Sequence, residues 1–310
     1  MPELPEVQTI VNDLNKKIKG DTITDFWSDW AKAIKGKSLE AFKKEIRGRK
    51  IVNARTIGKN IFIDLSGGKT LYIHLKMTGH LLIKFQKPNS KSQIKSKKQN
   101  SKSEKADYFE DKVNKYIHHI WYLRGNPPAG GKTLEFSDLR KFAKIVLDDT
   151  EKIQELPEIK ALGIDAMSPE LNFKKFQEIL SKKSKVPIGL LLMDQTAVSG
   201  IGNIYRSEIL FEAGVLPERK IADLSAEEIK LIFKNIKKVL QKAIKFRGTS
   251  DSDYRDTSGA PGSFQNVMKV YNKAGKKCPA SRQTGPKCDT IIIRKKFGQR
   301  SVFICPDCQK

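Results

Sequence analysis

Cysteine is scarce in this chain of 310 residues, and all four cysteines follow residue 277. This distribution excludes a dispersed disulfide framework, whereas clustered thiols are typical of a metal site. Long apolar runs are also missing, since no stretch approaches the roughly 18 residues that a membrane-spanning helix needs. The first residues lack the charged-then-apolar layout of a signal peptide. We therefore expect a cytoplasmic protein that has no membrane partner.

Acidic residues are few relative to basic ones. The chain has 35 Asp and Glu against 59 Lys and Arg, which gives a formal net charge of +24. Such an excess favours a polyanionic partner, most simply nucleic acid; an anionic membrane surface is the competing partner, against which we expect nucleic acid. Apolar residues make up 38% of the chain, which supports a real core, and the length suits two domains.

The first six residues, Met-Pro-Glu-Leu-Pro-Glu, hold an unusual candidate nucleophile. If Met1 is removed, Pro2 becomes a terminal secondary amine with a pKa near 8, and a useful fraction is neutral at physiological pH. Such an amine can form a Schiff base, and the neighbouring Glu3 can move the required proton. The alternative is a frayed end without function. Apolar spacing predicts a helix over 5–18, with Glu6 at its positive end.

Residues 22–147 change to a period of two, which predicts a sandwich or barrel of short strands. Two stretches interrupt the pattern. Residues 87–105 hold seven Lys and one Glu, and they predict a disordered basic insert reaching to about residue 112. Residues 124–132 predict a hairpin loop. The predicted strands are Ile51–Ala54, Asn60–Leu65, Leu71–Leu75, His80–Phe85, Tyr116–Leu123, Thr133–Phe136 and Ala143–Leu147.

A domain boundary is expected after residue 148, in the polar, acidic connection 148–162. The pattern is then helical to residue 270, with helices predicted from Ser168-Pro169, over 187–193 and over 203–212. Ser225 and Glu228 form a capping box that opens a further long helix. The polar, glycine-containing stretch Gly248–Val267 predicts a mobile loop.

The turn Ser-Gly-Ile-Gly-Asn at residues 199–203 precedes one of these helices. It is not expected to bind a dinucleotide, because helix rather than a buried strand comes before it. One interpretation is a helix N-terminus, capped by Asn203, whose exposed amide groups bind a phosphate. An ordinary packing turn between two helices is the other.

The four cysteines lie in residues 271–310, which form a separate unit. Cys305 and Cys308 have the spacing of a zinc knuckle, and sixteen residues separate them from Cys288. β-like runs at 290–293 and 301–304 predict a hairpin that makes a zinc ribbon with four thiolates. Cys278 departs from the usual spacing, since nine residues separate it from Cys288.

Basic residues at the predicted ribbon turn, Lys295, Lys296 and Arg300, are expected to meet phosphate, unless the ribbon is only a staple with solvated charges. The four histidines, His74, His80, His118 and His119, lie in predicted strands without a ligand spacing. We interpret them as satisfied strand residues, with a phosphate contact from one of them possible.

Three motifs occur here in one order: Pro-Glu-Leu-Pro-Glu, Gly-Ile-Gly-Asn and Cys-Pro-Asp-Cys-Gln-Lys. Together they closely resemble the formamidopyrimidine-DNA glycosylases of bacterial base-excision repair. Leu4 favours this branch over the related endonuclease VIII branch. The resemblance implies an α+β multidomain fold with an N-terminal β-sandwich domain (1–148), a helix–two-turns–helix domain (149–270) and a zinc ribbon (271–310) with one structural zinc ion.

The same resemblance implies a bifunctional DNA glycosylase and AP lyase, a monomer associated with the nucleoid. It would act on double-stranded DNA with oxidised purines or abasic sites. Pro2 would attack C1′ of the damaged nucleotide, and Glu3 would donate the proton that opens the sugar ring. Lys59 would contact phosphate and assist β-elimination, and Arg300 would grip the phosphate beside the lesion and act in δ-elimination.

Further residues match DNA-contacting positions of the family. Met77, Arg140 and Phe142 would fill the gap left by the extruded base, while Lys185 and Asn203 would contact phosphate. Residues 248–267 match the loop that closes over that base. In three places the chain departs from the family pattern. Gly189 stands where a lysine near the lesion is common, Tyr116 stands where a histidine that contacts phosphate is common (His118 is close by), and Leu139 replaces a frequent proline.

Two other functions stay open at this point. The Gly189 departure leaves room for action mainly on oxidised pyrimidines. A zinc-ribbon DNA-binding protein without catalysis would use the charge and the ribbon alone, and a retained Met1 would favour it, because a blocked terminus cannot form a Schiff base.

Overall fold

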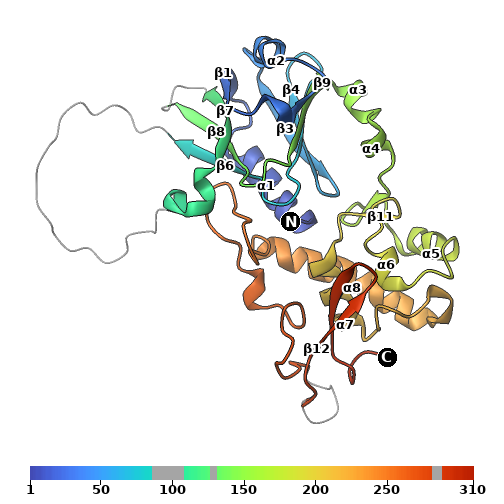
Figure 1. Cartoon of the computed structure of the whole chain (residues 1–310). Helices are drawn as coiled ribbons and strands as arrows, with labels where there is room; N and C mark the ends of the chain where they lie inside the picture. Colours follow the sequence, from blue (N-terminus) through green and yellow to red (C-terminus); the bar gives the residue numbers. More distant parts are fainter. Residues whose placement is uncertain (86–107, 126–130, 281–287) are drawn as a thin grey trace, which may run out of the picture.

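The computed structural model describes residues 1–85, 108–125, 131–280 and 288–310. The predicted basic insert falls largely outside these ranges, as do parts of the hairpin loop 124–132 and of the loop between Cys278 and Cys288. Two lobes are visible, with the N-terminus at their junction (Figure 1). We call them the sheet lobe (described residues of 1–149) and the helical lobe (161–270), against which the ribbon (described residues of 271–310) packs.

Two sheets form the sheet lobe. One has the order β1-β7-β8-β6 and the other β2-β9-β5-β4-β3, and apolar side chains of both belong to one buried cluster. The predicted sandwich is therefore confirmed, and the seven predicted strands match β3 to β9 within a few residues. The strands are β1 Thr22–Ser28, β2 Ile34–Lys35, β3 Ile51–Ile57, β4 Asn60–Leu65, β5 Lys69–His74, β6 His80–Phe85, β7 Ile117–Arg124, β8 Lys132–Ser137 and β9 Lys144–Asp149.

A helix in this lobe was not predicted. α2 spans Leu39–Ile46, and the Ser38 side chain caps it by accepting a hydrogen bond from the Ala41 amide at 3.2 Å. Phe42 and Ile46, four residues apart, are its buried residues. Reading the whole stretch 22–147 as strands was wrong here, because the helical period covers only two turns.

The leading helix α1 (Leu4–Lys17) connects the two lobes. A capping box begins it: the Glu3 side chain accepts from the Glu6 amide, and the Glu6 side chain accepts from the Glu3 amide. Val7, Ile10 and further apolar residues of α1 are buried in the sandwich cluster. Leu4, one turn earlier, belongs to the cluster of the helical lobe. The start of α1 is thus packed into both cores.

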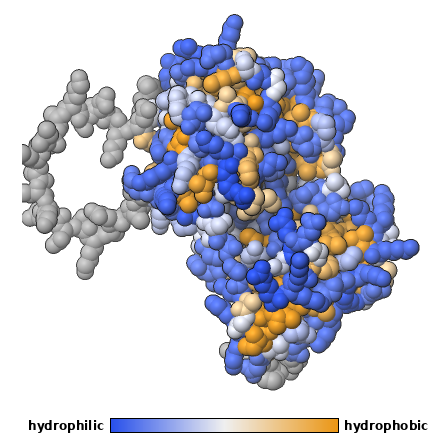
Figure 2. Space-filling view, in the orientation of Figure 1, coloured by the Kyte–Doolittle hydropathy of each residue, from blue (hydrophilic) through white to orange (hydrophobic). Residues whose placement is uncertain are grey.

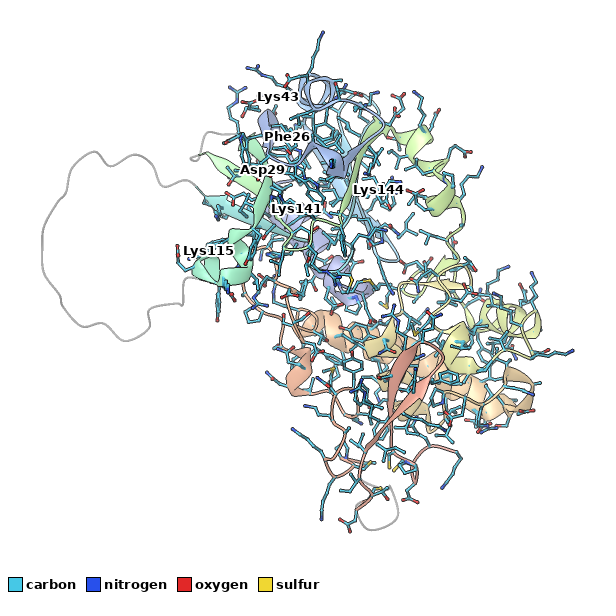
Figure 3. All side chains as sticks on the ribbon, viewed as in Figure 1. Phe26, Asp29, Lys43, Lys115, Lys141 and Lys144 are labelled. Atoms are coloured by element: carbon cyan, nitrogen blue, oxygen red, sulfur yellow. The ribbon has the colours of Figure 1, made fainter. Side chains whose placement is uncertain are left out.

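The predicted connection 148–162 contains two short helices, α3 and α4, which pack on the outer face of the five-stranded sheet. Lys144 of β9 pairs with Glu158 of α4 beside them (Figure 3). The next helix, α5, begins at Phe173 with Asn172 as its cap rather than at Ser168, so that prediction was wrong. The elements here are α3 Thr150–Gln154, α4 Pro157–Lys160, β10 Ile164–Asp165, α5 Phe173–Ser181, α6 Ile188–Leu191, β11 Val198–Ser199, α7 Asn203–Ala213 and α8 Ala226–Lys245.

The ribbon hairpin consists of β12 (Ile293–Phe297) and β13 (Arg300–Ile304). Its first strand lies further along the chain than predicted, because residues 290–292 pair instead with the segment before Cys278. Lys295 and Lys296 consequently lie on β12 and not on the turn, which corrects the prediction. Arg300 directly follows the turn.

The remaining short elements are 3₁₀ turns: η1 Ala31–Ala33, η2 Tyr108–Glu110, η3 Lys112–Lys115, η4 Ile221–Asp223 and η5 Phe264–Asn266. Within the described part of the chain, every helix is too short or too polar to cross a membrane. The face in Figure 2 is mostly hydrophilic, with apolar residues in small separate groups.

Candidate active site

The N-terminus is fixed by the helical lobe. The Leu4 amide donates to the Gly200 carbonyl at 3.1 Å. The Glu3 carboxylate accepts hydrogen bonds from the amides of Gly202 at 2.8 Å and Ile204 at 3.0 Å. Pro2 is buried, whereas Met1 is 48% exposed. Removal of Met1 would therefore leave a terminal amine directly before two residues, Glu3 and Leu4, that the helical lobe holds in place.

The glycine turn before α7 serves Glu3. Gly202, not Asn203, is the N-cap of α7, which corrects the predicted cap. A Cβ at Gly202 would lie 2.3 Å from the Glu3 carboxyl carbon, and a Cβ at Gly200, whose φ is +105°, would lie 2.4 Å from Leu4 Cδ1. The amide donors predicted to bind phosphate are thus occupied by a carboxylate of the same chain.

A second carboxylate lies beneath the first. Glu6 accepts hydrogen bonds from the Tyr205 hydroxyl at 2.5 Å, the Thr249 amide at 2.7 Å and the Glu3 amide at 2.8 Å. Complete burial, and then the nearby charge of Glu3, raise the pKa of Glu6 to about 7. Glu6 therefore joins α1, α7 and the start of the stretch 248–267 through a group that titrates near neutral pH.

Lys59 enters from the turn between β3 and β4. The Gly58 amide donates to Asp165 Oδ2 at 2.6 Å, and Lys59 Nζ donates to the Ile201 carbonyl at 2.9 Å. Burial lowers the pKa of Lys59, although the charges of Glu3 and Glu6 oppose this effect. A lysine with a lowered pKa can act more readily as a base at neutral pH.

One cavity collects these groups. Glu3, Lys59, Asn203 and Arg300, predicted from four separate parts of the sequence, all contribute to its wall, as does Met1. Sequence reasoning missed Tyr271, and it named Asp251 and Tyr254 only as part of the stretch 248–267, since nothing in their local sequence sets them apart before folding. The lining residues are Met1, Glu3, Lys59, Met193, Gly202, Asn203, Ile204, Thr249, Asp251, Ser252, Tyr254, Tyr271 and Arg300.

The predicted gap-filling residues lie together on the surface of the sheet lobe. Arg140 Nη1 is 3.0 Å from the Met77 sulfur, and the Arg140 guanidinium lies 4.7 Å from the centre of the Phe142 ring. Met77 is 42% and Phe142 52% exposed. We call these three residues the wedge. Two large apolar side chains are thus held in solvent around one cation.

Asp138 holds the backbone below the wedge. Its carboxylate accepts from the amides of Phe142 at 2.9 Å, Ala143 at 3.1 Å and Arg140 at 3.2 Å. It also accepts from the Thr78 hydroxyl at 2.5 Å. Asp138 is fully buried, so the loop has a rigid polar base although its tips are free.

Other predicted contact residues lie away from the cavity. Lys185 is exposed in the turn before α6, and Tyr116 is half-buried beside the wedge loop, where its carbonyl accepts from the Asp138 amide. His118 is buried, and its Nδ1 lies 2.9 Å from Asp29 Oδ1; its contact with DNA stays a prediction. A different histidine, His74, lines a second cavity together with Lys59 and Lys76. His74 is the last residue of β5, and this position at a strand end could have marked it in the sequence as a candidate site residue.

The stretch 248–267 is tied to the sheet lobe. Arg247, just before it, donates to Asp13 of α1 at 2.5 Å and to Asp256 at 2.6 Å. Near its other end, the Gly259 carbonyl accepts from the Asn114 side chain at 3.1 Å. We expected an irregular loop over these residues, and the structure shows an irregular loop whose named element is the short turn η5. Its mobility stays a prediction.

The four cysteines meet at one point in the ribbon. Their sulfur atoms all lie within 4.8 Å of one another, with 3.7 Å between Cys278 and Cys308 and between Cys288 and Cys305. Tetrahedral coordination with metal–sulfur bonds of about 2.3 Å places sulfurs about 3.8 Å apart. The donor set therefore fits a tetrahedral metal ion and includes Cys278 despite its unusual spacing.

Comparisons with known proteins agree with this arrangement. Residues 1–145 match the family profile of the formamidopyrimidine-DNA glycosylase N-terminal domain, and residues 162–254 match the H2TH domain of the same family. Formamidopyrimidine-DNA glycosylases of Carboxydothermus hydrogenoformans and Pelotomaculum thermopropionicum are 38% and 34% identical. The first comparison covers 100% of both chains, and the second covers 100% of this chain and 99% of the relative.

Solved structures are similar over the same extent. A Lactococcus lactis Fpg mutant in complex with DNA that contains Fapy-dG superposes with a TM-score of 0.79 at 29% identity, over 100% of both chains. The Lactococcus lactis Fpg bound to abasic-site DNA superposes with a TM-score of 0.78 at 28% identity, over 99% of both. This chain therefore belongs to the formamidopyrimidine-DNA glycosylase family, and it is a DNA glycosylase of base-excision repair.

Proposed function

We propose that this protein removes oxidised purines such as 8-oxoguanine and formamidopyrimidines from double-stranded DNA, and then cleaves the strand, with Pro2 as the nucleophile once Met1 is lost. The observation that carries the proposal is the Glu3 carboxylate, next in sequence to the buried Pro2. The amides of Gly202 and Ile204 at the start of α7 fix it, in a cavity that Lys59 and Arg300 also line. The Lactococcus lactis Fpg complexes with abasic-site and Fapy-dG DNA support this class of substrate.

The first stage exchanges one bond at C1′ for another. The Pro2 nitrogen forms a bond to C1′ as the bond from C1′ to the base breaks, and the base leaves with the proton that the Pro2 amine loses. Glu3 donates a proton to the ring oxygen, the C1′–O bond breaks, and an iminium links Pro2 to the opened sugar. A carboxylate held by two backbone amides can stay in place through both proton and bond transfers.

The second stage cuts the strand. The iminium acidifies the C2′ proton, a base removes it, and the 3′ C–O bond breaks with departure of the phosphate. Lys59 suits this stage because burial lowers its pKa. Arg300 suits the phosphate that leaves in the following δ-elimination, because a guanidinium offers paired donors to phosphate oxygens. Water then hydrolyses the remaining iminium and frees Pro2.

Base extrusion comes before both stages. Unstacking a base costs a few kcal/mol, and a damaged base costs less, which supplies part of the selectivity. The wedge supports the proposed filling of the gap, since apolar side chains inserted into the stack are the usual device.

The four cysteines would hold one zinc ion with a structural role. A closed four-thiolate site supplies folding energy and has no open position for catalysis. It would fix the β12–β13 hairpin and, with it, Arg300 at the cavity. Zinc analysis of Cys278→Ala tests the ligand set: an unchanged zinc content would remove Cys278 from it.

Borohydride trapping tests the proposal. We expect the protein to become covalently attached to duplexes that contain 8-oxoguanine, and Pro2→Gly to lose this attachment. A parallel experiment on a duplex with an oxidised pyrimidine distinguishes the two lesion classes. Stronger trapping on that duplex would mean that oxidised pyrimidines, and not oxidised purines, are the main substrate. Binding without trapping on either duplex would support a DNA-binding protein without catalysis.

A further inference from the structure

A buried cation near the active site is left unused by this mechanism. Arg206, on the first turn of α7, is 0% exposed. Its Nη1 donates to the Gly189 carbonyl at 3.3 Å and its Nη2 donates to Asn203 Oδ1, while its Nε has no hydrogen-bond partner. Among the described residues it forms no ion pair, which is unusual because a buried charge normally has a charged partner.

Its position connects three elements. The guanidinium lies between α6, which contributes the Gly189 carbonyl, and the ribbon, where the Phe297 ring centre is 6.0 Å away. The Asn203 side chain, which accepts from Arg206, donates in turn to the Ser301 carbonyl at 3.1 Å. Ser301 is the neighbour of Arg300. A short chain of contacts therefore runs from Arg206 to both predicted phosphate ligands of this region.

The charge of Arg206 persists although it is buried. Desolvation lowers its pKa to about 10, with Glu3 opposing this effect and Arg300 adding to it, so the group stays protonated at neutral pH. A buried cation without an ion-pair partner reduces the stability of the free protein. A ligand that brings negative charge to the nearby surface would offset that cost.

α6 cannot supply the cation itself. A Cβ at Gly189 would lie 2.7 Å from Pro217 Cβ and 2.8 Å from the Pro217 carbonyl oxygen, so any side chain there would displace backbone. The family-typical lysine at this position is thus sterically excluded in this chain. Arg206 extends instead from α7 to the Gly189 carbonyl.

We propose that Arg206 is a positioning residue for a DNA backbone phosphate: it orients Asn203 and supplies positive charge, held by no ion pair, beneath the surface where Asn203 and Arg300 meet that phosphate. This inference rests on the proposed function and extends it. The phosphate completes the electrostatic environment of Arg206 only when DNA is bound. Arg206 should therefore contribute more to DNA affinity than to the stability of the free protein.

The test measures the dissociation constant of the full-length protein for a duplex with a tetrahydrofuran abasic-site analogue over a series of salt concentrations. Arg206→Met and Arg206→Gln remove the charge, Arg206→Lys retains it, and Lys234→Met removes one exposed charge from α8 as a matched control. We expect both neutral variants to bind about tenfold more weakly, and the slope of log Kd against log salt to fall by about one. Arg206→Lys should retain the slope, and Lys234→Met should match the wild type.

Stability separates this role from a structural one. Both neutral variants should have melting temperatures within a few degrees of the wild-type value or above it. In these variants the fold-increase in KM for DNA should exceed the fold-decrease in the trapping rate at saturating DNA. Wild-type affinity and salt slope in either folded neutral variant would overturn the inference, as would failure of both to fold. If the wild type binds the duplex but is never trapped, the proposed catalysis fails while the comparison among variants still decides the role of Arg206.

Discussion

Two regions of the site are built in opposite ways. One is the surroundings of Glu3 at the start of α1, which we call the N-terminal corner, and the other is the wedge. Around Glu3, side chain and backbone are both buried, and the contacts come from residues about 200 positions away, at Gly202 and Ile204. In the wedge, Met77 and Phe142 extend into solvent, and only the backbone beneath them is fixed, by Asp138. The first arrangement holds reacting atoms in place, whereas the second holds a loop and leaves its tips free to enter DNA.

This difference follows from what each region has to do. Chemistry at C1′ tolerates little displacement, because a shift of about 1 Å can cost about a hundredfold in rate. A side chain that replaces a base must instead be available to a partner that arrives from outside, so burial within the protein would defeat it. Each region can be perturbed separately, and the expected effects differ in kind.

The largest effect is expected at the N-terminal corner. Glu3→Gln should reduce the single-turnover rate by about 10²–10⁴-fold, because proton transfer is lost while the amide clamp stays. Gly202→Ala should also lose about a hundredfold, since its Cβ would displace the Glu3 carboxyl group. Rapid-quench kinetics at saturating DNA measures both. A Glu3→Gln rate within threefold of the wild type would contradict the assigned role.

Substitution of Asp138, which fixes the backbone below the wedge, should lower the stability of the protein. Asp138→Ala leaves three amides and the Thr78 hydroxyl without their acceptor, and should lower the free energy of unfolding by about 3–5 kcal/mol. Urea denaturation measures the change, with the exposed Glu151→Ala as a control expected to lie within about 0.5 kcal/mol of the wild type. An equal effect in the two variants would show that Asp138 is not the anchor of the loop.

The corner should also respond to pH through Glu6. Its folded pKa of about 7 lies above the ordinary value of 4.5, so the folded state favours the protonated form. The stabilising contribution is complete below about pH 4.5 and is lost as the pH rises through about 7. Relative to the wild type, Glu6→Gln should therefore gain up to about 3 kcal/mol in unfolding free energy between pH 5 and pH 8. Parallel stability curves would refute an elevated pKa.

The smallest effect is expected at the wedge tips. Phe142→Ala should weaken binding to abasic-site DNA by roughly 1 kcal/mol, or about fivefold, because the gap in the stack is less well filled. Leu139 in the same loop is similarly exposed, 47% against 52% for Phe142. Leu139→Ala is therefore a matched control, and it should bind like the wild type. Equal losses would indicate general hydrophobic contact rather than insertion.

Local patterns predicted much of the fold. The period-two stretches correspond to β3–β9, and the Ser225 capping box begins α8 as expected. Errors occurred where a segment has an alternative pairing partner or where its period is too brief to recognise. The first ribbon strand was misplaced because residues 290–292 pair with the segment before Cys278, and the brief helix α2 shows too little of its period to be recognised.

For the site, the motifs and the family resemblance that they carry pointed to Glu3, Lys59, Asn203 and Arg300, which line one cavity. The relations between them could not be predicted. The same glycine turn is compatible with a bound phosphate or a bound carboxylate, and only the fold shows that Glu3 occupies its amides. Arg206 likewise has no signal in the sequence, since an arginine in a helix is ordinary until its burial is known.

The central claim is that the amine of Pro2 attacks the sugar, and mass spectrometry of the trapped adduct tests it most directly. The adduct formed with borohydride on 8-oxoguanine DNA is digested, and the peptide that carries the nucleotide is sequenced. We expect a peptide that begins at Pro2, lacks Met1 and is modified on the proline nitrogen. A modified lysine such as Lys59, or an adduct that retains Met1, would contradict the account.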